Sequence, residues 1–285
     1  MGLWKPFTGA PWRKLEMSSS SSKTPGKILQ LVRWELEKTF SAPLLAVMLA
    51  VALYLFIQAS SSGWTGGTEM FSVADLRTRF GRTCVRMANA EVVSSFTFSS
   101  FIFAAIASLG FSRDIASGYM RVLLSYPIGR ARLFLVKFSV LLIVPFLVFS
   151  GSLLFTQALI YSNVFWHVSP TIIAYVLLVM LIQMIFMLAV SVSVSLHVRQ
   201  PIMAFLASVV TLISMEQVSN SIAEPYQFLV PRWGTDILMT YGTDPSFFAS
   251  KYSFSDLLMP IIGMIIFPIV ISVFNLVYFK WRFQI

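Results

Sequence analysis

The residues that commonly carry enzymatic chemistry are few in this sequence and lie far apart. Cys84 is the single cysteine, so an intrachain disulfide cannot form. With two histidines, His167 and His197, it falls short of the ligand set of a structural zinc site. Gly26-Lys27 lacks the preceding Gly and the following Ser or Thr of a phosphate-binding loop. We therefore expect no catalytic residues, no metal site and no cofactor site in this chain.

Ionisable side chains are concentrated instead in short segments between long apolar ones. One such segment, FSRDIASGYMRVLLSYPIGRARLFLVK, runs from Phe111 to Lys137 between two apolar runs. Ser112-Arg113-Asp114 can start a helix, Gly118 can end it, and the Pro at position 127 marks a further break. A short helix exposed at a membrane surface would be a docking point for a partner. The alternative is an ordinary basic loop that serves only to set topology.

The overall composition is that of a polytopic membrane protein. Hydrophobic residues make up 57% of the 285 residues and charged residues 12%, against about 25% charged in a typical soluble domain. The net charge of +9 is compatible with nucleic-acid binding, but in a membrane protein it is better explained by basic residues retained on the cytoplasmic side. We expect no nucleic-acid partner.

Six apolar runs approach the length of about 20 residues that a helix needs to cross a bilayer. They are residues 42–59, 92–110, 138–161, 171–196, 201–215 and 257–279. None contains Asp, Glu, Lys or Arg, which counts against an ion-coupled carrier. The expected fold class is an all-α membrane protein with six transmembrane helices in residues 25–285. A flexible basic tail, residues 1–24, precedes them.

The distribution of basic residues predicts the orientation. With the N-terminus in the cytoplasm, 15 of the 21 Lys and Arg residues fall on the inner side of the membrane. Acidic residues show the opposite bias, with 8 of 12 on the outer side. Because loops rich in Lys and Arg stay inside, both termini are expected in the cytoplasm and the segment after Phe111 faces it too.

Residues 25–41, PGKILQLVRWELEKTFS, predict an amphipathic helix in the cytoplasmic interface. One half of its helical wheel holds Ile28, Leu29, Leu31, Val32, Leu36 and Phe40, and the other holds Lys27, Gln30, Arg33, Trp34, Glu37 and Lys38. Glu35 is the exception, because its carboxylate falls inside the apolar arc and needs a partner. We expect it to pair with Arg113 or Arg121. The alternative is that it remains at the headgroup edge. Arg33, Glu35 and Lys38 are the candidate residues of this helix.

The order of these features resembles the permease subunit of ABC-2 type transporters. The family pattern between the second and third spans is an acidic residue, a small residue with Gly, Leu-Leu, Pro, Arg and Lys. These are Asp114, Ser117-Gly118, Leu123-Leu124, Pro127, Arg130 and Lys137. Asp114 stands where Glu is more usual, and Tyr119 stands where Thr is common. The resemblance covers most of the chain after Lys27.

The resemblance implies a set of partners and roles. Residues 113–118 would form a coupling helix that docks on a separate nucleotide-binding ATPase subunit, which binds ATP and Mg²⁺. The coupling residues would be Arg113, Asp114, Ile115, Ser117, Gly118 and Arg121. A second permease chain, identical or a paralogue, would complete the transporter. Residues 216–256 would contain a segment folded back into the membrane; a plain outer loop is the alternative.

The function expected from this resemblance is transport across the plasma membrane, with this chain as a permease and not an enzyme. The substrate is not readable from the sequence, and export is the direction expected from the family. A different class of function has the same topology: a non-transporting anchor or assembly subunit of a larger membrane complex. A channel or carrier that needs no ATP is a third, weaker alternative.

Overall fold

The computed structural model describes residues 24–40, 42–63, 99–125, 129–160, 170–221 and 254–282. Within these ranges the chain is helical apart from short turns, and no β-strand occurs. Residues 99–107 are α-helical and lead directly into a π-helix. The other elements are α1 (Thr24–Thr39), α2 (Ala42–Gly63), the π-helix η2 (Ser108–Ser112), α4 (Arg113–Ala116), α5 (Tyr119–Ser125), α6 (Arg130–Ile160), α8 (Pro170–His197), α9 (Pro201–Ser221) and α12 (Phe254–Arg282).

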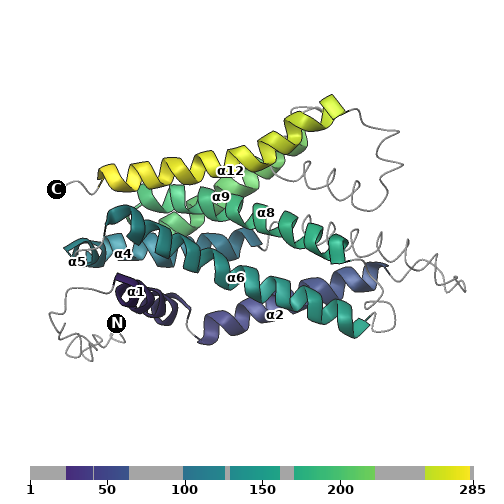
Figure 1. Cartoon of the computed structure of the whole chain (residues 1–285), viewed down its shortest axis with the longest axis horizontal. Helices are drawn as coiled ribbons and strands as arrows, with labels where there is room; N and C mark the ends of the chain where they lie inside the picture. Colours follow the sequence, from purple (N-terminus) through teal and green to yellow (C-terminus); the bar gives the residue numbers. More distant parts are fainter. Residues whose placement is uncertain are drawn as a thin grey trace, which may run out of the picture.

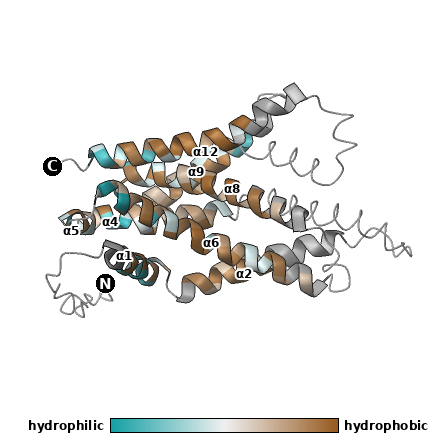
Figure 2. Cartoon of the chain, viewed as in Figure 1, coloured by the Kyte–Doolittle hydropathy of each residue, from teal (hydrophilic) through white to brown (hydrophobic). Residues whose placement is uncertain are grey.

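The long helices form an elongated bundle. Helix α6 contacts α1, α2, α8 and α12, and α8 contacts α9 and α12 (Figure 1). The N-terminal helix α1, the short helices α4 and α5 and the end of α12 gather at one end of the bundle. Polar residues are concentrated at that end, whereas the lengths of the helices are mostly apolar (Figure 2). We call it the charged end.

Several described helices are long and apolar enough to cross a membrane. Four do so on their own: Arg130–Phe155, Met180–His197, Pro201–Val218 and Ile265–Arg282. Two further helix pairs meet the same criteria together but are bent, by 73° between α1 and α2 and by 80° between α4 and α5. By length and composition the part of the chain that the structure describes therefore has four to six candidate spans. The predicted all-α class is confirmed, while the number six remains a prediction.

Two predicted boundaries need correction. The third apolar run was expected to begin at residue 138, but α6 begins at Arg130. The helix starts earlier because Leu133 and Phe134 are buried at its beginning, which makes these two turns part of the core. The fifth run was expected to end at residue 215, but α9 continues to Ser221 and has 21 residues. It reaches spanning length without any added segment.

Some expectations fall outside the residues that the structure describes. These are the basic tail of residues 1–23, the beginning of the second span before residue 99, and most of the expected re-entrant segment, residues 222–253.

Aromatic side chains form the core near the charged end. Phe111 of η2, Phe134 of α6 and Phe279 of α12 are each almost fully buried. Their ring centroids lie 5.6 Å apart for Phe111 and Phe134, 5.5 Å for Phe134 and Phe279, and 6.4 Å for Phe111 and Phe279. Tilted pairs at this spacing are favourable beyond the burial of their area. They hold three segments together beside the polar residues described below.

The π-helix η2 is fastened to the turn between α8 and α9. The Ser108 hydroxyl donates to the carbonyl oxygen of Pro201 at 2.7 Å, and the Ser112 hydroxyl donates to that of Val198 at 2.8 Å. Val198 directly follows the last residue of α8, and carbonyl groups at the C-terminal end of a helix lack partners within their own helix. Both serines are buried, so these bonds satisfy hydroxyl and carbonyl groups that have little access to water.

Helices η2 and α6 approach most closely at Gly110. A Cβ atom added to Gly110 would lie 2.7 Å from Cδ1 of Leu141, which is fully buried. Leu141 is one turn after Lys137 on α6, so this contact also brings Lys137 toward η2. A larger residue at position 110 would therefore force the buried Leu141 side chain to move.

Gly110→Ala is expected to destabilise the protein by about 1–3 kcal/mol, because the added methyl group overpacks the contact with Leu141. Thermal unfolding in detergent, followed by size-exclusion chromatography of the remaining folded protein, measures the effect. Gly151→Ala on α6 is the matched control, because nothing lies within 4 Å of its added Cβ. Equal stability of the two variants would contradict the proposed packing.

Candidate functional site: a buried charge cluster

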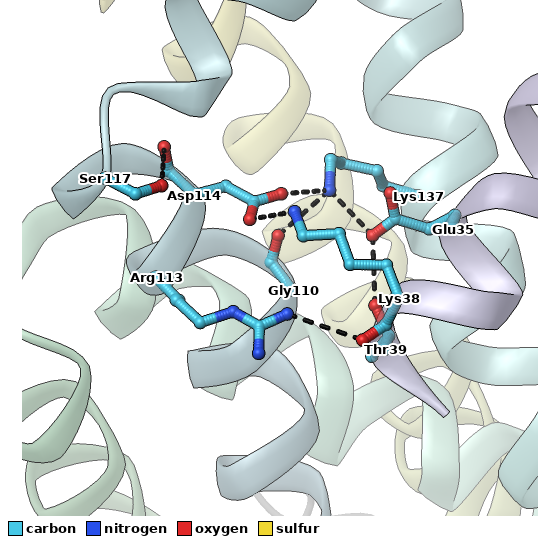
Figure 3. Close-up of polar contacts among 8 residues, drawn as sticks. All are labelled: Glu35, Lys38, Thr39, Gly110, Arg113, Asp114, Ser117 and Lys137. Atoms are coloured by element: carbon cyan, nitrogen blue, oxygen red, sulfur yellow. Dashed lines mark hydrogen bonds and ion pairs between the residues drawn. The ribbon is translucent and has the colours of Figure 1, made fainter. Parts of the chain in front are cut away.

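A lysine of α6 is buried at the centre of the charged end. The side chain of Lys137 has no exposed surface. Its Nζ atom donates to Oε1 of Glu35 at 2.7 Å, to Oδ2 of Asp114 at 2.7 Å and to the carbonyl oxygen of Gly110 at 3.0 Å (Figure 3). An ammonium group has three donors, so all three are satisfied. The two carboxylates come from α1 and α4, so one side chain joins three separate parts of the chain.

A second lysine completes the charge balance. The other carboxylate oxygen of Asp114, Oδ1, forms an ion pair with Lys38 of α1. The Lys38 ammonium lies 4.6 Å from the ring centroid of Trp34 and 4.4 Å from that of Tyr119. The two rings stack on each other at 4.8 Å. A cation near aromatic rings is stabilised further, and this contact ties α1 to α5.

We call Glu35, Lys38, Asp114 and Lys137 the charge cluster. Its two acids and two bases cancel, so the buried group carries no net formal charge. Burying an ion pair costs several kcal/mol per ion in desolvation, and mutual attraction offsets this only when the geometry and hydrogen bonds are good. Such a cluster adds little net stability. We expect it to favour this arrangement of helices, because separating the four side chains would leave a charge buried alone.

The partner expected for Glu35 was wrong. Its Oε1 atom accepts from Lys137 and, at 3.2 Å, from the Thr39 hydroxyl; neither Arg113 nor Arg121 contacts it. Arg113 donates to the backbone carbonyl of Lys38 at 3.5 Å instead. The side chain of Arg121 is exposed. Glu35 pairs with Lys137 because α6 begins at Arg130 and places Lys137 beside α1. The predicted span began only at residue 138 and so left Lys137 out.

The bounds of α1 agree with the prediction, and the division of its faces agrees in part. The helix forms over Thr24–Thr39, close to the expected 25–41. Its apolar arc is divided: Leu31 is buried against the bundle, whereas Leu29 is 72% exposed. Arg33 lies on the exposed side and pairs with Glu37 at 2.9 Å. The inward face therefore contains the polar residues of the cluster together with apolar ones.

The predicted coupling segment, residues 113–118, is a short helix followed by a bend. Residues 113–116 form α4, which continues η2, and Asp114 faces inward with 1% of its surface exposed. The chain bends after Ser117, and the separate short helix is α5. Ile115 is half-buried, while Ser117 is exposed. Of the six predicted coupling residues, Asp114 is therefore a buried residue and Arg121 is the one carried on the outer face of α5.

Gly118 is the residue that permits the bend. It is the single glycine of the described chain with a positive φ, 72°, and its amide donates to the carbonyl oxygen of Ile115 at 3.2 Å. The left-handed conformation is accessible to glycine and costs other residues about 1–2 kcal/mol. The prediction that Gly118 ends a helix is confirmed.

Gly118→Ala is expected to destabilise the protein by about 1 kcal/mol, and Gly118→Asn by less, because asparagine adopts the left-handed region more readily. The same thermal-unfolding measurement ranks the variants. Gly129→Ala is the control, because nothing lies near its added Cβ and its φ is not positive. If alanine at 118 were as stable as glycine, the bend would not depend on this residue.

Comparison with models of known protein families gives no match for this sequence, and comparison with curated proteins gives none either. Among the described residues no group of three His, Cys, Asp or Glu side chains is placed to hold a metal ion. By length and composition, the described helices are those of a membrane protein. The charge cluster joins α1, α4 and α6 at one end of the bundle, and any proposed function has to account for it.

Proposed function

We propose that this chain is the membrane-spanning permease subunit of an ABC-2 type transporter, driven by ATP hydrolysis in a separate subunit. The observation that carries the proposal is the bent α4–α5 unit at the charged end, joined to α1 and α6 by the charge cluster. A partner that pushes on α5 would move α4, and Asp114 would transmit the movement to Lys137. A short helix that is exposed and also rigidly linked to long apolar helices suits such transmission.

The two faces of α5 support a docking role. Met120 and Leu123 are buried and anchor the helix to the bundle. Arg121 and Ser125 are exposed, and Val122 is 49% exposed. This seven-residue helix packs on the bundle with one face, so its other face is accessible to a soluble protein. In this proposal the coupling helix is α5, with its contact surface at positions 121, 122 and 125.

The distribution of charge supports a cytoplasmic position for this surface. The Lys and Arg residues of the described chain lie in or beside elements of the charged end. They are Lys27, Arg33, Lys38, Arg113, Arg121, Arg130, Arg132, Lys137, Arg199, Lys280 and Arg282. Basic residues mark the cytoplasmic side of a membrane protein, which is where ATP is available. The proposed location is the plasma membrane with both termini inside, and export is the proposed direction.

The transporter would need a second permease chain beside this one. Within the described helices, the candidate spans of α9 and α12 are the least covered, with 22% and 17% of their windows buried. In a membrane these faces contact lipid or another chain. Whether the second chain is identical or a paralogue does not change the proposed role of α5.

Site-directed cross-linking tests the proposal. In a Cys84→Ser background, Val122→Cys is expected to cross-link in native membranes to a soluble ATPase with a phosphate-binding loop. Lys280→Cys is the matched control, because it is also exposed at the charged end but lies on α12. A cross-link to such an ATPase at 122 and not at 280 supports the proposal. Cross-links at 122 to membrane proteins alone, under several conditions, would favour an anchor subunit instead.

A further inference from the structure

A second group of side chains at the charged end takes no part in the charge cluster. The imidazole of His197, at the end of α8, stacks on the Tyr278 ring of α12 with centroids 4.3 Å apart. The guanidinium of Arg282 lies 5.7 Å from the same ring and donates to the Tyr278 hydroxyl at 3.3 Å. Nδ1 of His197 lies 2.7 Å from the carbonyl oxygen of Ser193, which fixes the orientation of the imidazole. One tyrosine therefore holds an arginine and a histidine side by side.

The charge around this group is of one sign in the described chain. Arg199 is exposed two residues after His197, and Lys280 is exposed two residues before Arg282. The acidic residues of α9 and α12, Glu216 and Asp256, belong to the far ends of those helices. No ion pair links Arg199, Lys280 or Arg282 to a described carboxylate. An anion that reached this surface would meet no acidic competitor on the described residues of α8, α9 or α12.

An apolar face of α12 begins directly beside these cations. Val270, Phe274, Val277 and Trp281 recur at intervals of four, three and four residues, so they share one side of the helix. Each is about half exposed or more, and Trp281 is 71% exposed. The Phe274 ring is nearly parallel to that of Tyr278, so the apolar face is continuous with the aromatic ring that holds Arg282. Tryptophan and tyrosine favour the level of lipid headgroups.

We infer that this surface binds an anionic glycerophospholipid. The phosphate would be bound by Arg282 with Arg199, since a guanidinium suits a phosphate in bidentate geometry. The acyl chains would lie along the face from Trp281 to Val270. The positive charge of this surface favours an anionic lipid over a second copy of this chain as the binding partner. Two copies of this surface would bring like charges together. The inference requires membrane insertion with this end at the interface, and it does not depend on transport.

Native mass spectrometry of the detergent-solubilised protein tests the inference. Dioleoylphosphatidylglycerol is expected to be retained more strongly than dioleoylphosphatidylcholine, which has the same acyl chains and no net charge. Arg282→Gln is expected to weaken the retention of phosphatidylglycerol about fivefold, the effect of one basic residue near an anionic surface. Arg132→Gln on α6 is the control, because Arg132 is exposed at the same end but belongs to a different helix from Arg282.

Several outcomes would overturn the inference. Equal retention of the two lipids would show that charge is not recognised. Equal loss in the two variants would show a general effect of surface charge. Stabilisation by inorganic phosphate to the same extent as by the lipid would show a free-anion site instead. Because Arg282 is near the end of α12, Arg282→Gln is expected to keep its chromatographic profile, and Arg199→Gln gives a second test of the same phosphate group.

Discussion

Lys137→Met is expected to destabilise the protein by about 3–5 kcal/mol, because it leaves two carboxylates buried without their shared cation. Methionine has a similar length and no charge, so it fills much of the space but supplies no hydrogen bonds to Glu35 and Asp114. The carbonyl oxygen of Gly110 also loses its contact with the ammonium group. The measurement is the midpoint of thermal unfolding in mild detergent, read from the folded peak in size-exclusion chromatography.

Lys38→Met is the matched control for this prediction. The Lys38 side chain is 19% exposed, and its partner Asp114 would still be paired with Lys137. The expected loss is therefore smaller, on the order of 1 kcal/mol. Equal effects of the two substitutions would contradict the assignment of Lys137 as the centre of the cluster.

A double substitution separates the charge effect from lost packing. Adding Glu35→Gln to Lys137→Met removes a carboxylate that would otherwise remain charged and buried. The pair is therefore expected to be more stable than Lys137→Met alone, whereas independent effects would simply add. If the second substitution only increased the damage, the cluster would not be held by charge balance.

Much of the helical architecture follows from hydropathy, because an uncharged run of about 20 apolar residues has few alternatives to a buried or membrane-spanning helix. Predicted and observed helices agree closely for the fourth apolar run, 171–196 against Pro170–His197. The end of α4 was predictable from Gly118, because glycine is the residue that ends a helix in a left-handed conformation. These features are local, so the residues that determine them are adjacent in the sequence.

The charge cluster was less predictable because it depends on contacts between distant residues. Glu35 and Lys137 are 102 positions apart, and no local pattern joins them. One signal was present: Glu35 lies in an apolar arc, and Lys137 lies in the apolar segment LFLVKFSV, so each needs an opposite charge. Matching acids and bases in apolar surroundings would have identified this pair. The π-helix η2 had no comparable signal, because its side-chain hydrogen bonds run to residues 93 and 86 positions away.

Asp114→Arg is expected to prevent stable folding, whereas Arg113→Glu is expected to change stability by less than about 1 kcal/mol. An arginine at position 114 would place a third cation beside Lys38 and Lys137 and remove one of the two acids that neutralise them. Arg113 is only half-buried and makes one long contact, of 3.5 Å, with the carbonyl oxygen of Lys38. Expression level and thermal midpoint of the two single variants check this contrast between adjacent residues.

This contrast determines which substitutions can report on coupling. Exchanging the charges of Arg113 and Asp114 looks from the sequence like a surface change, yet loss of transport in that variant would reflect loss of the fold. Arg121→Glu on α5 changes an exposed side chain and is expected to leave the thermal midpoint unaltered. If it also reduces binding of the proposed ATPase subunit about tenfold or more, the proposal that α5 is the docking element is supported. Full binding by Arg121→Glu and Val122→Asp together would exclude α5 and leave the charge cluster with a purely structural role.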